Sequence, residues 1–181
     1  QPEAPPVAAV FAYGTLRGDY SPAGDHWGVI RETGATWVLA SAKGYKLYQD
    51  PQLMYPFATP TGNSADRLEG TLLTWPGGAN VRPAIEQINA IEGFDEERPE
   101  DGLYRRTVVE VESLTPARSP SGSGSLEAPG AGQASGSGSG IGGAPTKLRA
   151  YLYYQVWPQE HLDRCHHFPD GRWSKEHRRR R

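Results

Sequence analysis

A glutamate at the end of an amphipathic segment is the first candidate for chemistry. Glu92 lies four residues after Ile88 and continues the apolar stripe of a predicted helix, so its carboxyl group is expected on the inner face at the C-terminal end. The helix dipole disfavours an anion there and burial disfavours charge, so both effects raise the pKa of this group. Such a carboxyl group can exchange protons near neutral pH. In the alternative interpretation the helix ends at Ile91, and Glu92 faces solvent or pairs with Arg105 or Arg106.

A second candidate is the turn Tyr13-Gly14-Thr15-Leu16-Arg17, which directly follows an apolar run at 7–12. Glycine lets the backbone approach a ligand, and consecutive backbone N–H groups in a tight turn form a pocket for a carboxylate or an oxyanion. The turn is not a phosphate loop, because it lacks the Walker spacing and the Lys-Ser/Thr ending. Taken alone, a Tyr-Gly-Thr sequence after a strand indicates only a turn.

Other reactive side chains favour structural roles. A zinc site could be drawn from His161, Cys165, His166 and His167, but their spacing matches no common zinc finger and apolar neighbours favour ordinary packing. No base is placed specifically beside Cys165, which argues against a nucleophilic cysteine. The acidic stretch 95–101, between Glu92 and Tyr104, is typical of a solvated loop rather than a metal cage. The sequence therefore predicts no metal site.

The elements that must position these residues are mostly strands. Apolar and β-branched runs bounded by Gly, Pro, Asp or Asn predict strands at 7–13, 36–42, 44–48 and 68–75. One helix is predicted between a capping Asn80 and a terminating Gly93. Its inner face comprises Val81, Ala84, Ile85, Ile88 and Ile91, and its outer face Glu86, Gln87 and Asn89.

A segment of low complexity interrupts the chain at about 115–146. It consists of Gly, Ser, Pro and Ala with almost no large apolar side chains, so it cannot offset its ordering entropy and is predicted to be a disordered loop. The residues on both sides alternate as in half-buried strands, at 107–112 and 148–157. Because loop closure costs little more for a longer loop, we expect one domain at 7–174 with this insertion, an N-terminal extension at 1–6 and a basic tail at 175–181.

Composition restricts the class of protein. The 181 residues are 36% hydrophobic and 10% aromatic, enough for the core of one domain. No stretch approaches the roughly 18 to 20 apolar residues of a membrane span, and the first residues lack the pattern of a signal peptide. The single cysteine suits a reducing compartment, so a cytoplasmic protein is expected. The basic tail lacks interleaved aromatic residues, which favours a solvated tail over nucleic-acid binding. The sequence carries no signal about oligomeric state.

Several segments resemble, in order, one known family. They are Val10-Phe11-Ala12-Tyr13-Gly14-Thr15-Leu16-Arg17, Tyr55-Pro56, Leu68-Glu69-Gly70-Thr71-Leu72, Ile88-Asn89-Ala90-Ile91-Glu92-Gly93, Tyr104-Arg105-Arg106 and the aromatic strand 149–155. The first is similar to the opening strand and Tyr-Gly-Ser/Thr-Leu turn of the γ-glutamylcyclotransferase and AIG2-like family. The fourth resembles the Leu-Asp-x-x-Glu-Gly segment that carries that family's catalytic glutamate. Asn89 departs from the pattern, because an aspartate often stands there.

The resemblance implies a fold and a set of roles. The fold would be an α+β domain, a small mixed-strand β-barrel with a few packed helices. Glu92 would be the general acid/base and Tyr104 a wall of the substrate pocket. Either Tyr151 or Tyr153 would supply the family's second tyrosine, since both share one face of the last strand. The substrate loop would comprise Tyr13, Gly14, Thr15, Leu16 and Arg17.

The resemblance also implies a reaction that needs no metal or cofactor. The α-amino group of a γ-glutamyl amino acid or γ-glutamylamine attacks its own γ-carbonyl, which gives 5-oxoproline and releases an amine, as in glutathione metabolism. The protein then has only to fold the substrate, stabilise an oxyanion and move one proton. The main alternative is a catalytically silent AIG2-like module that binds a small molecule or a partner, because fold similarity does not guarantee activity. A weaker alternative is an adaptor that acts through its basic tail.

Overall fold

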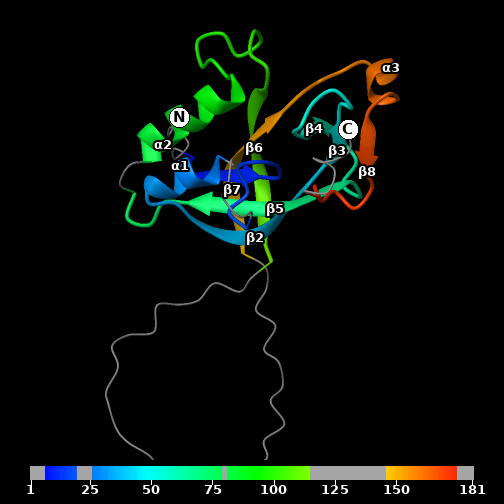
Figure 1. Cartoon of the computed structure of the whole chain (residues 1–181). Coiled ribbons are helices and arrows are strands. Elements are labelled where there is room, and N and C mark those ends of the chain that lie inside the picture. Colours follow the sequence, from blue (N-terminus) through cyan, green and yellow to red (C-terminus); the bar gives the residue numbers. More distant parts are fainter. Residues whose placement is uncertain (1–6, 20–25, 79–80, 115–145, 175–181) are drawn as a thin grey trace, which may run out of the picture.

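Two β-sheets and three helices make up the part of the chain that the computed structural model describes, residues 7–19, 26–78, 81–114 and 146–174. Figure 1 shows their arrangement. In chain order they are β1 (Ala9–Ala12), α1 (Trp27–Glu32), β2 (Thr36–Lys43), β3 (Tyr45–Gln49), β4 (Phe57–Pro60), β5 (Arg67–Thr74), α2 (Val81–Glu92), β6 (Arg105–Ser113), β7 (Lys147–Tyr154), α3 (Gln159–Leu162) and β8 (His166–Phe168).

The larger sheet is a closed barrel in the order β1-β5-β2-β6-β7. Its pairs are antiparallel except for β1 and β7, which run parallel and meet at Val10 and Tyr151. The smaller sheet has the order β4-β3-β8 and is antiparallel throughout. A mixed-strand barrel with a few helices confirms the predicted α+β fold.

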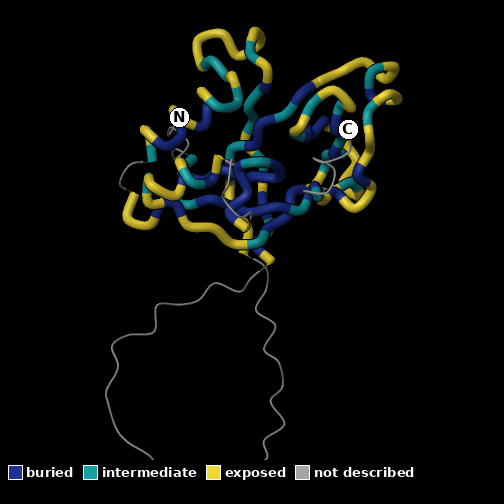
Figure 2. The backbone as a smooth tube through the Cα atoms, viewed as in Figure 1, coloured by how far each residue is buried: buried dark blue, intermediate teal, exposed yellow. Residues whose placement is uncertain are grey.

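The apolar strand β1 lies at the centre of the molecule, and all four of its residues are buried. Val10 belongs to a core cluster shared with α1 and α2, whereas its neighbour Phe11 belongs to a second cluster shared with the barrel strands and the C-terminal segment. Figure 2 shows the buried segments, in dark blue, gathered in the interior of the molecule. Because both faces of β1 are covered, its sequence is a continuous apolar run rather than an alternating one.

The buried face of helix α2 agrees with the prediction except at one residue, Asn89. Ala84, Ile85 and Ile88 are buried, and the helix stops before Gly93, whose φ is 63°. Asn89 was predicted on the outer face, but only 7% of it is exposed. It lies four residues after Ile85 and so shares the inner stripe, where its amide group is hydrogen-bonded.

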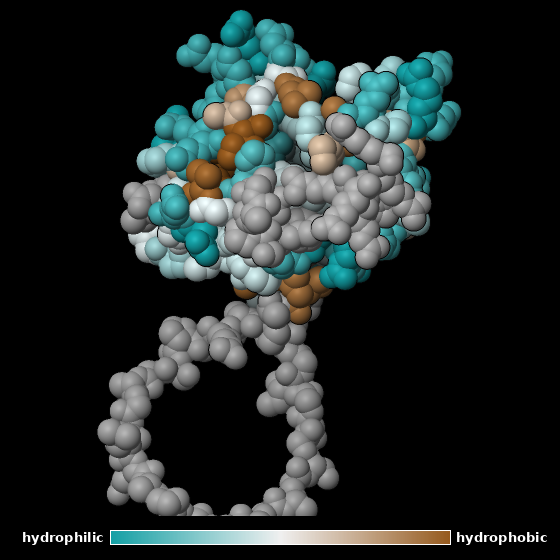
Figure 3. Space-filling view, viewed as in Figure 1, coloured by the Kyte–Doolittle hydropathy of each residue, from teal (hydrophilic) through white to brown (hydrophobic). Residues whose placement is uncertain are grey.

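In the described part of the chain, no helix is both long enough and apolar enough to cross a membrane. On the face shown in Figure 3, apolar side chains gather beside α2, while the α3 corner is hydrophilic.

The strands on either side of the low-complexity insertion pair as predicted. β6 and β7 are antiparallel with a continuous register from Arg105 and Tyr154 to Glu112 and Lys147. The Ser113 N–H also donates to the Thr146 carbonyl oxygen, at 2.9 Å. Residues 115–145, the extension 1–6, the basic tail 175–181 and the predicted cap Asn80 lie outside the described residues, so the expectations for them stay predictions.

Replacing residues 115–145 by a short turn is expected to leave folding and activity unchanged. The two strand ends already meet at Ser113 and Thr146, so a short connection can close the hairpin without moving either strand. Urea unfolding and a turnover assay of the shortened chain check this. Loss of solubility in the shortened chain would instead indicate that the two sides fold as separate units.

Candidate active site

A pocket of about 210 Å³ lies where the turn after β1 meets the end of α2. Its wall comes from six separate stretches of the chain, which the fold brings together. The lining residues are Phe11, Ala12, Tyr13, Gly14, Thr15, Leu16, His26, Met54, Tyr55, Pro56, Ile91, Glu92, Leu103, Tyr104 and Tyr153. Glu92 is the one acidic residue among them, so its carboxyl group is the one in this lining that can exchange a proton with a bound molecule.

The carboxyl group of Glu92 has the altered acidity that its position predicts. Burial raises its pKa from the usual 4.5 to about 8, because the charged form loses solvation in the pocket wall. Glu92 is the last residue of α2, so the alternative in which the helix ends at Ile91 is wrong. Arg105 and Arg106 pair instead with Glu100 and Glu96, at 3.1 and 3.0 Å.

Four of the five predicted turn residues line the pocket, and Arg17 does not. The Arg17 N–H donates to the Gly14 carbonyl oxygen at 3.1 Å and closes the turn. Its side chain is buried away from the lining, where Nε donates to Asp19 Oδ1 at 2.8 Å and Nη1 to the Trp173 carbonyl oxygen at 3.2 Å. The guanidinium therefore anchors the turn to the C-terminal segment.

The hydroxyl groups of Tyr13 and Tyr104 are occupied by backbone contacts. Tyr13 donates to the Tyr153 carbonyl oxygen at 2.6 Å and accepts from the Ala58 N–H at 3.1 Å. Tyr104 donates to the Pro56 carbonyl oxygen at 2.8 Å. Burial raises the pKa of both groups well above the usual value. Because each phenol has one hydrogen to donate, these two residues line the pocket with their rings and have no hydroxyl hydrogen left for a ligand.

Of the two tyrosines left open by the sequence, Tyr153 lines the pocket and Tyr151 does not. The Tyr153 hydroxyl donates to Asn89 Oδ1 at 2.6 Å. Burial raises its pKa above the usual value, against the opposing effect of Arg106. The ring of Tyr151 lies instead under the Arg106 guanidinium, 4.1 Å from its central carbon. The hydrogen bond from Tyr153 to Asn89 therefore holds the pocket-facing side of β7 against α2.

A polar network behind the pocket was missed by sequence reasoning. Arg106 Nη1 donates to Asn89 Oδ1 at 3.1 Å and pairs with Glu96, while Asn89 Nδ2 donates to Glu96 Oε1 at 3.2 Å. The guanidinium also lies 4.6 Å from the Phe94 ring centre. The network holds the last turn of α2 against β6 and β7. The four-residue spacing of Asn89 from Ile85 was the one signal in the sequence that could have placed Asn89 on the inner face.

Asn89→Ala is expected to destabilise the fold by roughly 1 to 3 kcal/mol, because it leaves the buried Tyr153 hydroxyl without its acceptor. It also removes one acceptor of Arg106 Nη1, which keeps its contact with Glu96. Urea unfolding measures the change. Gln87→Ala, on the exposed side of the same helix, is the matched control and is expected to change stability by less than about 0.5 kcal/mol. Equal stability of the two variants would contradict a role for Asn89 in holding the helix end.

The barrel, the pocket and its one acid define an α+β domain with a single carboxyl group of raised pKa in its pocket. The family model described as gamma-glutamyl cyclotransferase, AIG2-like, matches residues 10–130. The chain belongs to this family, which confirms the resemblance of its motifs and gives it a γ-glutamylcyclotransferase-like fold. The search of curated proteins finds no match.

Similar solved structures are known from mouse and from a plant. An AIG2-like protein of Mus musculus is 12% identical, with a TM-score of 0.49, and the alignment covers 92% of this chain and 88% of that one. A protein of Arabidopsis thaliana is 16% identical, with a TM-score of 0.43 and coverage of 87% and 80%. A second Arabidopsis thaliana protein is 21% identical, with a TM-score of 0.46 and coverage of 84% and 66%.

Proposed function

We propose that this protein is a γ-glutamylcyclotransferase-type enzyme. Its substrate is a γ-glutamyl amino acid or a γ-glutamylamine, and its products are 5-oxoproline and the released amine. The observation that carries the proposal is the Glu92 carboxyl group, whose pKa is about 8, facing the pocket beside the turn that follows β1. Family membership supports the same class of reaction.

The proposed reaction makes one carbon–nitrogen bond and breaks another. The substrate's α-amino nitrogen attacks its own γ-carbonyl carbon, and Glu92 takes the proton that this nitrogen loses. Glu92 then returns the proton to the departing nitrogen as its bond to the γ-carbon breaks. The carboxyl group ends in its starting state, so one residue serves as base and then as acid. A pKa near the working pH suits both steps.

The turn is proposed to hold the anionic parts of the substrate and the reaction. The side-chain hydroxyls of Tyr13 and Tyr104 are committed to backbone carbonyls, and Arg17 is held by Asp19. The backbone N–H groups around Gly14 and Thr15 therefore remain as donors for the α-carboxylate or the oxyanion. Held between the tyrosine walls, the glutamyl chain would be bent toward the geometry in which amine and carbonyl meet.

Purified protein incubated with a panel of γ-glutamyl amino acids and γ-glutamylamines tests this function. Formation of 5-oxoproline together with one equivalent of free amine is expected from at least one compound. Saturable binding of these compounds without any product would indicate the silent binding module instead. The leaving amine is expected to meet the rim of the pocket, where Met54 and Leu103 are about half exposed.

The acidity of Glu92 predicts how stability depends on pH. In the folded chain Glu92 stays protonated up to a pKa of about 8, whereas in the unfolded chain it ionises near 4.5. The folded state thus binds the extra proton between these values, and its stability falls as pH rises from 4.5 to 8. The difference corresponds to at most about 5 kcal/mol. Urea unfolding at pH 5 and pH 9 measures it.

Glu92→Gln is the reference for that experiment, because glutamine is uncharged at every pH. The free energy of unfolding of the parent is expected to fall relative to this variant as pH rises. Parallel pH profiles for the two proteins would contradict a raised pKa at Glu92.

A further inference from the structure

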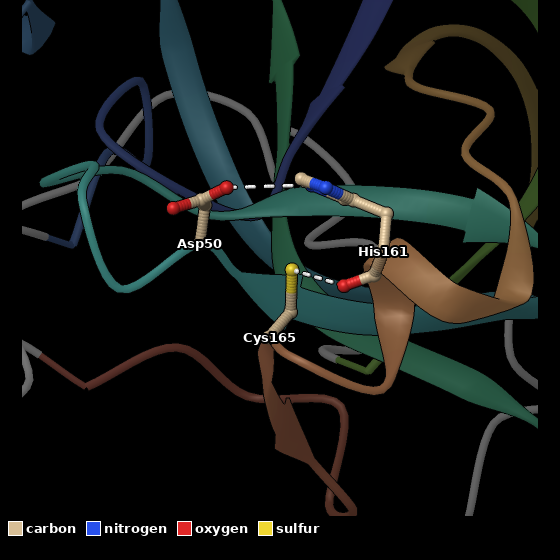
Figure 4. A group of neighbouring side chains, drawn as sticks. All are labelled: Asp50, His161 and Cys165. Atoms are coloured by element: carbon tan, nitrogen blue, oxygen red, sulfur yellow. Dashed lines mark hydrogen bonds and ion pairs between the residues drawn. The ribbon is translucent and has the colours of Figure 1, made fainter.

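Three side chains that can bind metals converge at a place outside the pocket. Asp50 directly follows β3, His161 belongs to α3, and Cys165 lies between α3 and β8. Their ligand atoms all lie within 4.8 Å of one another. Figure 4 shows the Asp50 carboxylate facing the His161 ring, with the Cys165 sulfur directed to the same region. None of the three belongs to the lining of the candidate active site.

The spacing of the donor atoms is close to that of a metal site. Asp50 Oδ2 and His161 Nε2 are 3.3 Å apart. Two ligands of a tetrahedral zinc ion, bound at about 2.0 to 2.3 Å, are separated by about 3.3 to 3.8 Å. The carboxylate and the imidazole already have that separation, and the Cys165 sulfur lies within 4.8 Å of both. All three side chains are half-buried, so they remain accessible to an ion.

Two neighbouring contacts hold these donors in position. The second carboxylate oxygen of Asp50, Oδ1, accepts the Gln52 N–H at 2.8 Å, which leaves Oδ2 directed at His161. The indole of Trp157 stacks on the His161 ring with centres 4.3 Å apart and planes 28° apart. A hydrogen bond to the second oxygen of a ligating carboxylate is typical of metal centres, and the stacked indole orients the imidazole.

We propose that Asp50, His161 and Cys165 bind one zinc ion, with a water molecule as the fourth ligand. A mixed set of oxygen, nitrogen and sulfur donors suits zinc better than magnesium or calcium, which prefer oxygen alone. A carboxylate and a thiolate together carry the two negative charges that balance Zn²⁺, while the imidazole binds uncharged. Binding releases the thiol proton to solvent.

The ion would have a structural role. Asp50 begins the stretch that supplies Met54, Tyr55 and Pro56 to the pocket wall, and His161 and Cys165 belong to the segment after β7. Zinc would tie these two stretches together. His166 and His167 take no part, since their rings contact Phe168 and Tyr48. The sequence analysis considered His161 and Cys165 together with His166 and His167, but not Asp50, because Asp50 lies more than a hundred residues before them.

Zinc content and cobalt spectroscopy of the full chain test the proposal, and neither depends on turnover. After incubation with zinc and exhaustive dialysis, one zinc ion per chain is expected by elemental analysis. Cobalt(II) is expected to give a thiolate-to-metal charge-transfer band and the strong visible absorption of a four-coordinate ion. Zinc is expected to raise the melting temperature of the parent.

Variants separate this site from other metal binding. Cys165→Ser is expected to lose the charge-transfer band, and Asp50→Asn to weaken zinc binding by about 100-fold or more. His167→Ala, from the same segment, and Glu92→Gln, from the pocket, are expected to bind zinc as the parent does. Circular dichroism without metal verifies that each variant is folded. Substoichiometric zinc in the parent, or an unchanged cobalt spectrum in Cys165→Ser, would overturn the proposal and leave only the 3.3 Å contact between His161 and Asp50.

Discussion

Glu92→Gln is expected to lower kcat for 5-oxoproline formation by about 10² to 10⁴-fold, the usual contribution of a positioned acid or base. Glutamine has the same shape as the protonated glutamate that predominates below pH 8, so the pocket keeps its form while the proton carrier is lost. KM is expected to change little, because the backbone of the turn still binds the substrate. Initial rates with the best substrate of the panel give both constants.

Glu86→Gln is the matched control for that variant. Glu86 lies on the same helix, but it is exposed and pairs with Arg82 at 2.8 Å. Its replacement makes the same chemical change of side chain at a distance from the pocket, so kcat is expected to stay unchanged. If Glu92→Gln turned over as fast as the parent, Glu92 would not be the proton carrier. Product formation by the parent would still establish the reaction, so the two conclusions are tested separately.

The second large effect is expected at Gly70, in the strand that lies against β1. A Cβ atom there would lie 2.1 Å from the Ala12 carbonyl oxygen and 3.1 Å from the Tyr13 Cα. Since both neighbours are backbone atoms, the end of β1 has to move. Gly70→Ala is therefore expected to destabilise the fold by about 3 kcal/mol and to displace the turn at the pocket. Urea unfolding measures the first effect, and kcat/KM the second.

Gly28→Ala provides the comparison for Gly70→Ala. Gly28 is a helical residue of α1, and a Cβ atom there meets nothing within 4 Å. Alanine at this position is expected to leave stability unchanged or to raise it by up to about 1 kcal/mol through its helix propensity. Equal effects of the two substitutions would mean that β1 and β5 are not as closely packed as described.

The regular elements were predictable because their patterns are local. Strands β2, β3 and β5 and helix α2 lie within a residue or two of the predicted ranges, and β6 and β7 pair across the insertion as expected. The inward direction of Glu92 followed from the helical period alone. The raised pKa of its carboxyl group then followed from burial.

The features that were not predicted depend on contacts between distant segments. β4 and β8 have four and three residues, too few to show a period, and the smaller sheet exists only because β3 pairs with both. Asn89 was assigned to solvent on its polarity, but its partners come from β6 and β7. Arg17 belongs to the turn in sequence, yet its side chain points to Trp173. No local pattern encodes such partners.

The anchoring of the turn at 13–17 by the C-terminal segment has a consequence for biosynthesis. Arg17 donates to the carbonyl oxygen of Trp173, and the Trp173 indole N–H donates to Gln49 Oε1 at 2.8 Å. The Glu69 N–H donates to the Gly171 carbonyl oxygen at 2.8 Å, which ties the same segment to β5. A chain still attached to the ribosome therefore lacks these anchors until residue 173 has left the exit tunnel. A nascent chain that has not yet exposed residue 173 is therefore not expected to hold the turn at 13–17 in its final position.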